Sequence, residues 1–346
     1  MKRFSLLLAS AAAMIAAPLA AETIAITGGK LVIGDGSAPI EGGTVVISND
    51  RVVAAGANVP IPSNARRIDA TGKWVTPGVF AGFSRIGLVE VGAVSQTNDM
   101  NASGSPFSAA LDVQYAINPF ASAVAVNRAA GVTRAVVSPS TSGSIFGGYG
   151  AIVDLGQDED AITQARSFQF VELGETGHSR AGGSRSASHV QFRAMLEEAR
   201  TYARNPAAFD SDLLKASDAK ALLPVINGSM INDRDAHQLR YSTQYAGNLV
   251  ALNKVPRATG LSWNEAFAAI SSVPAEIMGM GGKLGSLKSG RQADVVIWDG
   301  DPLELSTQVE NVLIDGVEQS LSNRQIRLRD RYRNPAPGAL PKAYDY

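Results

Sequence analysis

Two strand-rich regions near opposite ends of the chain place the strongest limit on the fold. The first, residues 22–75, contains short runs of valine and isoleucine separated by Gly-Gly, Asp-Gly and Asn-Asp turns. The second, residues 283–320, has the same character in "ADVVIW" and "VENVLIDGVEQ". Neither region alone has enough strands to bury a stable hydrophobic core. We therefore expect one small composite β-sandwich built from both chain ends, with a larger domain inserted between them.

The inserted residues 76–282 alternate between strand-like and helix-like runs. Strands are expected in "VTRAVVSPS", "YGAIVDLG", "SFQFVELG" and "ALLPVI". Helices are expected in "NPFASAVAVNRAAG", "HVQFRAMLEEARTYAR", "AHQLRYSTQYAGNLVALN" and "SWNEAFAAISSVPAEIMGM", the last opening with a capping box of Ser262 and Glu265. This alternation predicts an α/β domain with a parallel sheet, either open or closed into a barrel.

Residues 1–21 have the pattern of a signal peptide. Lys2 and Arg3 precede a short apolar run, and small residues before Glu22 suit cleavage. The alternative is an N-terminal membrane anchor, for which the apolar run is short. We expect a periplasmic or secreted protein that has no membrane segment once the leader is removed.

Composition removes several classes of function. The chain has no cysteine, so thiolate nucleophiles and thiolate metal sites are excluded. The formal net charge of −1 gives no reason to expect nucleic acid or anionic lipid as a partner. The arginine- and proline-rich residues 321–346 are expected to form an extended strap or tail, with nucleic-acid binding as the alternative.

Three segments together resemble the amidohydrolase superfamily, and within it the exported imidazolonepropionase-like branch. "ARRIDATGKWVTPGVFAGFSRIGL" resembles the passage from a small sandwich into the first barrel strand. "VELGETG" followed by "RAGGSRSAS" resembles the strand-four region, and "SSVPAEIMGMGGKLGSLKSGRQADVVIWDGDPLE" resembles the return into the sandwich. The resemblance implies a (β/α) barrel with a divalent metal, zinc in the family, at the carboxyl ends of the strands. It also implies hydrolysis of non-peptide carbon–nitrogen bonds by metal-activated water.

The family's metal ligands do not carry over to this chain. Ala81, Phe83 and Arg85 stand where the resemblance implies aspartate, histidine and histidine. Phenylalanine has no lone pair to offer and arginine is always cationic, so neither can bind a divalent metal.

Histidine content gives the same result. The chain contains three histidines, His178, His189 and His237, so a four-histidine centre cannot be built. Their spacing matches no zinc signature, and surface or cap positions are favoured over a three-histidine site. We expect no metal site and no cofactor-binding residues.

The inserted domain is also short. A complete (β/α)8 barrel needs about 250 residues, and residues 76–282 fall below that length. The missing strands fall near "PVINGSMINDRD". Asp233 and Asp235 lie near this junction, but neither can be assigned as the metal-binding aspartate that the family carries on strand eight. We therefore expect an incomplete barrel, whose free sheet edges make a homo-oligomer possible.

Two residues remain candidates for a cleft. Glu175, in "LGETG", follows a strand at the end where barrel enzymes place working groups. Arg85 would point into the same mouth and could bind an anionic ligand with its fork of donors. The structural alternatives are a hydrogen bond from Glu175 to the next loop and an ion pair of Arg85 with Glu90 or another nearby acid.

Three hypotheses for function remain open. The chain is a hydrolase of non-peptide carbon–nitrogen bonds with a divergent or absent metal centre, or a catalytically inactive envelope protein (a pseudoenzyme) that binds a small ligand. The third is a shortened remnant that folds poorly. The partner expected in the first two is a small molecule, and the sequence names no particular substrate.

Overall fold

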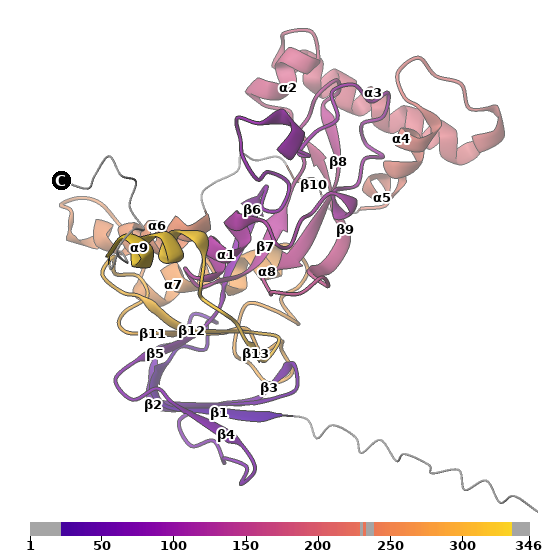
Figure 1. Ribbon diagram of the computed structural model, residues 1–346. Helices are drawn as coiled ribbons and strands as arrows, with labels where there is room; N and C mark the ends of the chain where they lie inside the picture. Colours follow the sequence, from indigo (N-terminus) through magenta and orange to yellow (C-terminus); the bar gives the residue numbers. More distant parts are fainter. Residues whose placement is uncertain (1–21, 229–230, 233–238, 334–346) are drawn as a thin grey trace, which may run out of the picture.

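The computed structural model describes residues 22–228, 231–232 and 239–333, which form two sheets and their helices (Figure 1). The first sheet has the strand order β13-β12-β11-β5-β1-β2-β3, with β4 paired to β1. Its strands are β1 (Thr23–Leu31), β2 (Ile40–Ser48), β3 (Arg51–Gly56), β4 (Arg66–Asp69), β5 (Trp74–Pro77), β11 (Val295–Trp298), β12 (Val309–Ile314) and β13 (Val317–Glu318).

Strands from both ends of the chain join in this first sheet. β5 pairs antiparallel with β11, so that Thr76 lies opposite Val296. One face of the sheet encloses a buried apolar cluster to which both ends contribute: Ile24, Ile26, Val45, Ile47, Val75, Val295, Ile297 and Leu313. The alternating apolar residues of the two regions supply this face because successive side chains of a strand point to opposite sides. The two-layered sandwich form stays a prediction, since all eight strands belong to one hydrogen-bonded sheet.

The second sheet is mixed. Its order is β10-β9-β8-β7-β6. The strands are β6 (Val79–Ser84), β7 (Val132–Val137), β8 (Phe146–Asp154), β9 (Ile162–Val171) and β10 (Ile231–Asn232). β6 is parallel to β7 and β9 to β10, but β7, β8 and β9 run antiparallel to one another.

The prediction of a parallel sheet is therefore wrong for the middle of this domain. Residues 138–145 and 155–161 connect β7 to β8 and β8 to β9. A parallel crossover needs a dozen or more residues, so these short connections allow only antiparallel neighbours. Within the described residues the sheet is open, with β6 and β10 at its edges.

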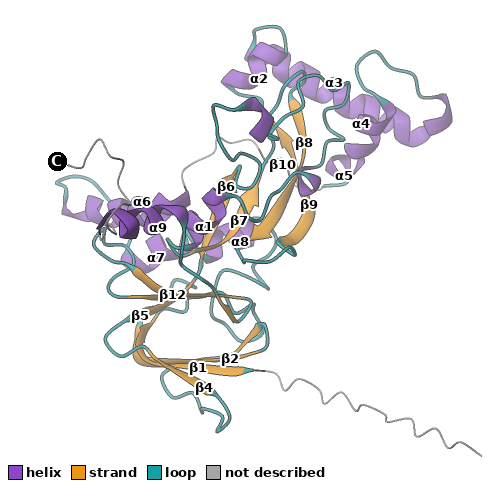
Figure 2. Cartoon of the chain, viewed as in Figure 1, coloured by secondary structure: helices purple, strands orange, loops and turns teal. Residues whose placement is uncertain are grey.

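Helices gather around the second sheet, whereas the far end of the first sheet consists of strands and loops (Figure 2). The helices are α1 (Ser122–Arg128), α2 (Glu175–Arg180), α3 (Arg185–Arg204), α4 (Ala216–Ala221), α5 (Leu223–Ile226), α6 (Ser242–Ala251), α7 (Trp263–Ala268), α8 (Ser272–Ile277) and α9 (Arg324–Arg333). None of these described helices is long and apolar enough to cross a membrane.

Most predicted elements are confirmed, and two are wrong. The strands in "VTRAVV", "YGAIVD" and "SFQFV" are present, as are helices in all four expected regions and the capping box of Ser262 and Glu265. "ALLPVI" is helical: Ala221 and Leu222 are buried in the core beside α3, and Pro224 lies in the first turn of α5.

The expected strap or tail of residues 321–346 also needs correction. Residues 324–333 form α9, whose arginine, glutamine and leucine residues are good helix formers. The Asn323 side chain accepts a hydrogen bond from the backbone N–H of Ile326 at 3.0 Å and so caps the first turn. Residues 334–346 lie outside the described residues.

A buried ion cluster joins the two sheets. Arg134 of β7 is 2% exposed and donates to both carboxylate oxygens of Asp294, at 2.7 and 3.1 Å. The same guanidinium lies 2.5 Å from Asp315 and 3.5 Å from Asp154. Asp294 precedes β11 and Asp315 lies between β12 and β13, so this Arg134 cluster ties the second sheet to the first.

Candidate functional site

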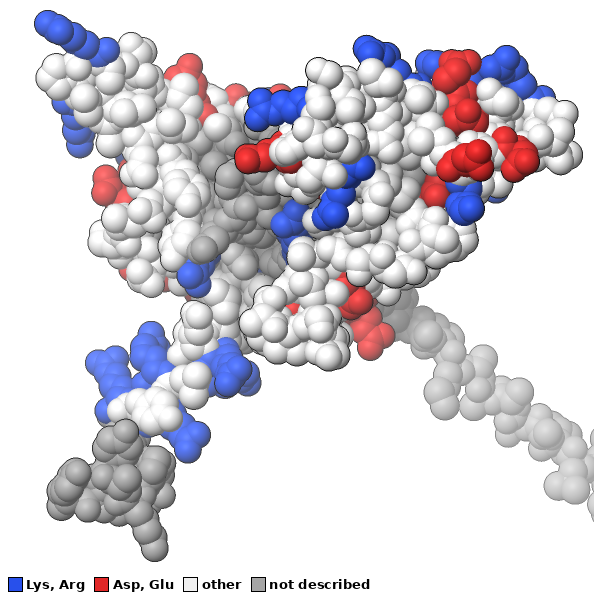
Figure 3. All heavy atoms as spheres, turned by 90° about the horizontal axis from the view of Figure 1, so that it is seen from above, with Lys and Arg blue, Asp and Glu red and all other residues white. Residues whose placement is uncertain are grey.

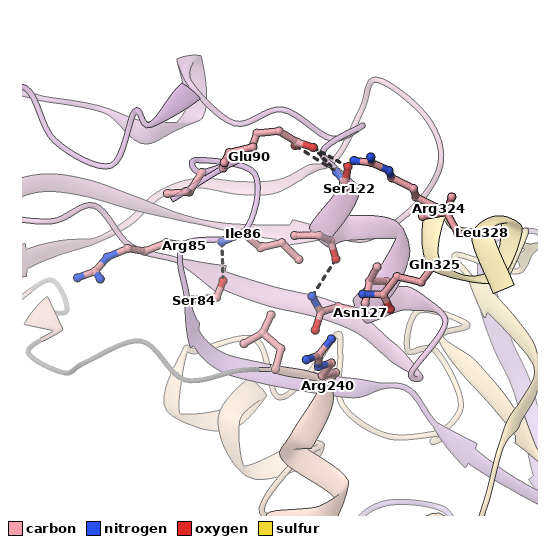
Figure 4. Close-up of a pocket in the computed structure, with 15 residues that line it drawn as sticks. Ser84, Arg85, Ile86, Glu90, Ser122, Asn127, Arg240, Arg324, Gln325 and Leu328 are labelled. Atoms are coloured by element: carbon pink, nitrogen blue, oxygen red, sulfur yellow. Dashed lines mark hydrogen bonds between the residues drawn. The ribbon is translucent and has the colours of Figure 1, made fainter. Parts of the chain in front are cut away.

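A cleft of about 610 Å³ opens beside the carboxyl end of β6 (Figure 4). Its walls come from the loop after β6, from α1, from the short turn Leu239–Tyr241 and from α9. Apolar side chains cover much of it: Ile86, Val89, Val91, Ala123, Val126, Leu239 and Leu328. Polar side chains line the rest: Ser84, Arg85, Glu90, Ser122, Asn127, Arg240, Arg324 and Gln325.

Hydrogen bonds at the end of β6 fix the floor of the cleft. The Ser84 hydroxyl donates to the carbonyl of Val136 at 2.8 Å, and the backbone N–H of Ser138 donates to the carbonyl of Ser84 at 2.9 Å. Gly87, at φ +80°, then turns the chain back against Asn118, an approach at which a Cβ atom would meet backbone at 3.2 Å. This turn brings the loop after β6 alongside α1.

Glu90 stabilises the start of α1 and does not pair with Arg85. Its carboxylate accepts hydrogen bonds from the Ser122 hydroxyl at 2.5 Å and from the Ser122 backbone N–H at 3.1 Å. A carboxylate is favourable at a helix N-terminus because the first N–H groups carry partial positive charge. The expected ion pair between Arg85 and Glu90 is therefore wrong.

Asn127, in the wall of the cleft, has an unsatisfied buried acceptor. Its amide nitrogen donates to the carbonyl of Ala123 at 2.8 Å, whereas its Oδ1 is buried and has no partner in the described structure. Figure 4 places Asn127 beside Arg240 and Gln325. Leaving a buried acceptor unpaired costs free energy, and a turn of the side chain that exposed this atom to a ligand donor would recover that cost.

Two guanidinium groups give the cleft its positive charge. Arg240 lies over the ring of Tyr241, 4.8 Å from its centroid, and Arg324 opens α9. Neither forms an ion pair with a carboxylate among the described residues. The acidic side chain that lines the cleft, Glu90, is already engaged by Ser122. The cleft can therefore accept an anion.

The two residues predicted for a cleft do not come together here. Arg85 lines the cleft, but in Figure 4 its guanidinium points away from Arg240 and Gln325. Its Nε is buried without a partner in the described part of the chain. Glu175 is the exposed first residue of α2 and is not among the residues that line the cleft.

Sequence reasoning missed Glu172, three residues before Glu175. Glu172 is 7% exposed, lies directly after β9, and accepts a hydrogen bond from the Thr141 hydroxyl. Ser138, directly after β7, has a buried hydroxyl with no partner in the described residues. The usable signal for Glu172 was its position directly after the buried run "FQFV", at the end where barrel sites lie.

The residues at the expected metal positions do not fit a divalent metal. Phe83 is 7% exposed and packs on Phe170, with ring centroids 5.9 Å apart. His178 lies on α2 and His189 on α3, and His237, Asp233 and Asp235 fall outside the described residues. Nowhere in the described ranges do three or more histidine, aspartate or glutamate side chains come close enough to share a metal ion.

Comparison with known proteins finds similarity to amidohydrolases over part of the chain. Residues 235–318 match the amidohydrolase family (Amidohydro_3). The amidohydrolase tasK of Hapsidospora irregularis is 43% identical over 60 residues, which is 17% of this chain and 6% of that protein. The chain thus spans only a small part of that relative's length.

Solved structures extend the likeness to the fold. An amidohydrolase from Thermotoga maritima MSB8 has a TM-score of 0.70 at 20% sequence identity, and the match covers 87% of this chain and 100% of that one. Phenylurea hydrolase B is less similar, with a TM-score of 0.48 at 13% identity over 92% of this chain and 100% of that one. The expected amidohydrolase resemblance is confirmed at this level, and the imidazolonepropionase-like branch stays a prediction.

Proposed function

We propose that this chain, which has an amidohydrolase fold and matches that family over residues 235–318, binds a small organic acid carrying an amide N–H in the cleft beside β6. The observation that carries the proposal is Asn127 Oδ1, a buried acceptor without a partner in the described residues, in a cleft that also holds Arg240 and Arg324. The family's metal chemistry has no part in this proposal, because Phe83 and Arg85 do not fit a metal.

Each feature of the cleft selects part of such a ligand. Asn127 Oδ1 would accept the ligand's N–H once its side chain turns toward the cleft, and a guanidinium binds a carboxylate with two parallel donors. The apolar walls would hold an acyl or aryl group, as ligand clefts are largely apolar with a few placed polar groups. N-acyl amino acids and ureido acids combine these three parts. The protein would then be a pseudoenzyme that retains the family's fold as a binding scaffold.

Binding can be measured by calorimetry with a panel of N-acyl amino acids and ureido acids. Arg240→Ala and Arg324→Ala are each expected to weaken binding by about tenfold or more, since a charged hydrogen bond contributes about 1.5–3 kcal/mol. Arg193→Ala is the matched control, because Arg193 is exposed on α3 and does not line the cleft. Equal affinity in all three variants, or no binding by the parent protein, would contradict the proposal.

Hydrolysis of a non-peptide carbon–nitrogen bond is the second candidate function. The observation that favours it is Glu172, a carboxylate buried directly after β9 where barrel enzymes place working groups. A carboxylate in that position can act as a general acid or base. If this function holds, Glu172→Gln abolishes product formation from amide substrates while Glu175→Gln retains it.

The inference that this protein holds no metal ion can be tested separately. Elemental analysis of protein purified without added metal or chelator is expected to show far less than one zinc, iron or manganese per chain. About one tightly held metal ion per chain would overturn it and direct attention to ligands that include His237 and its neighbours.

A further inference from the structure

α9 concentrates positive charge in a chain that is otherwise acidic. Its ten residues include one acid, Asp330, and five arginines: Arg324, Arg327, Arg329, Arg331 and Arg333. The helix therefore carries a formal charge of +4, while the whole chain carries −1 and the remainder −5. The near-neutral total, which gave no reason to expect an anionic partner, hides this separation of charge.

The charge of α9 is exposed and largely unpaired. No residue of the helix is buried. Arg329 lies 2.7 Å from Asp330, and the other four arginines form no ion pair with any described carboxylate. Figure 3 shows lysine and arginine side chains gathered on a part of the surface that projects from the body of the molecule. A helix placed in this way can approach a flat, extended anionic surface.

Apolar side chains are interleaved with the arginines. Leu328 is 38% exposed and Tyr332 is 60% exposed, and the Arg331 guanidinium lies 5.9 Å from the centre of the Tyr332 ring. Arginine with leucine and an aromatic residue is the composition of helices that lie in the interface of a membrane. Tyrosine places its ring at the headgroup level, and arginine stems extend along apolar surface while their heads stay in water.

We propose that α9 docks this protein on an anionic phospholipid surface. A lipid surface is favoured over nucleic acid because the leader predicted in residues 1–21 would carry the chain out of the cytoplasm, to a compartment bounded by lipid and poor in nucleic acid. Each arginine near such a surface strengthens binding by roughly fivefold at low salt. The attraction falls as salt shortens the Debye length.

The same helix forms one wall of the cleft. Arg324, Gln325 and Leu328 line the cleft, while Arg327, Arg329, Arg331 and Arg333 do not. Docking through the second set would hold the cleft close to the lipid headgroups. The docking proposal stands without the ligand proposed above, because none of these four arginines lines the cleft.

Co-sedimentation with vesicles tests the docking. The parent protein is expected to bind vesicles of phosphatidylglycerol and phosphatidylcholine, and not vesicles of phosphatidylcholine alone. The variant R327E/R329E/R331E is expected to lose at least tenfold in affinity, and about 0.5 M salt is expected to have a similar effect on the parent. The control R185E/R193E/R200E on α3 changes the net charge by the same amount and is expected to bind nearly as well as the parent.

Three outcomes would overturn the proposal. They are no binding of the parent to anionic vesicles, an equal loss in the α9 and α3 variants, and tighter binding to double-stranded DNA than to vesicles at matched phosphate concentration. Because α9 has no buried residue, the triple variant should melt within a few degrees of the parent. R327Q/R329Q/R331Q provides a second variant with a smaller change in charge, and it should show an intermediate loss.

Discussion

Arg134 is the central residue of the buried ion cluster that connects the two sheets. Burial by itself lowers the pKa of this guanidinium, but the charges and hydrogen bonds of Asp294 and Asp315 raise it overall. One buried cation therefore faces three carboxylates, of which Asp154 is the most distant. Excess buried negative charge is costly in a low-dielectric interior, so at least one acid is held toward its protonated form.

Asp154 makes stability depend on pH. Burial raises the pKa of Asp154 to about 6, although the nearby Arg134 opposes the rise. The folded state then binds this proton more tightly than the unfolded state, so stability is greatest below the ordinary pKa and falls as the pH rises through about 6. Between about pH 4 and pH 7.5 the loss from this group is on the order of 2 kcal/mol.

Urea denaturation of the parent and of Asp154→Asn at several pH values measures this effect. The variant cannot titrate, so its free energy of unfolding is expected to fall less over the same range. Burial, and after it the negative charge of Asp294, also raise the pKa of Asp315, so Asp315→Asn should change the profile in the same direction. Parallel profiles for the parent and the Asp154 variant would contradict this assignment.

Among the elements, α7 begins with a cap that the sequence shows directly. The Ser262 hydroxyl accepts from the backbone N–H of Glu265, and the Glu265 carboxylate accepts from the Ser262 backbone N–H at 2.9 Å. Ser262→Ala is expected to lower the free energy of unfolding by about 1 kcal/mol, because it leaves an N-terminal donor of the helix unsatisfied. Chemical denaturation measures the change, and Ser322→Ala, at an exposed serine whose hydroxyl makes no hydrogen bond in the described structure, is the control. A similar loss in both variants would speak against the cap.

Local patterns predicted these elements better than they predicted their arrangement. The buried runs of β7, β8 and β9 and the periodicity of α3 can be recognised in the sequence. Whether a side chain faces the core or the solvent sets the pattern of apolar and polar residues within each short segment. The antiparallel order of β7, β8 and β9 depended on the lengths of two loops, which alternation alone does not give. The apolar run "ALLPVI" could form a strand or a helix on its sequence alone. In the structure it is helical and packs against α3, which shows that tertiary contacts outweigh local preference here.

The cleft was harder to predict than the fold. Arg85 lines the cleft and is predictable because a family motif gives its position an expected residue, whereas Phe83 of the same motif packs on Phe170 in the core. Asn127 lies in the middle of an expected helix, and its importance comes from an unpaired oxygen that only the packing of α1 against its neighbours reveals. The expectation of an extended strap treats residues 321–346 as uniformly rich in proline and arginine, whereas the prolines all follow residue 333 and leave 324–333 free to form a helix.

At the scale of the whole molecule, the two sheets share one apolar core. Val132, Ala135 and Val153 of the second sheet pack in the same buried cluster as Trp298 and Val312 of the first. The Trp298 indole also donates to the Thr76 hydroxyl at 2.9 Å. Its ring covers Gly131, where φ is +84° and an added Cβ would come within 2.5 Å of the indole. The two sheets should therefore unfold as one cooperative unit.

Trp298→Ala tests this cooperativity. The substitution is expected to lower the free energy of unfolding by about 3–5 kcal/mol, the usual range for a buried tryptophan, while unfolding remains a single transition. Far-UV circular dichroism and the fluorescence of the remaining tryptophans should give coincident curves. Leu305→Ala, at a side chain that is 74% exposed, is the control. Two separated transitions in the parent protein would show that the sheets are independent.

The pairing of β5 with β11 also has a consequence for biosynthesis. Thr76 and Trp298, which form a hydrogen bond across this pair, are 222 residues apart in the chain. While the ribosome is making the intervening residues, β5 has an unpaired edge, and the strands of the first region cannot complete their sheet. Contacts of such long sequence separation form slowly. If the leader predicted in residues 1–21 directs export of the unfolded chain, β5 and β11 would pair only on the far side of the membrane.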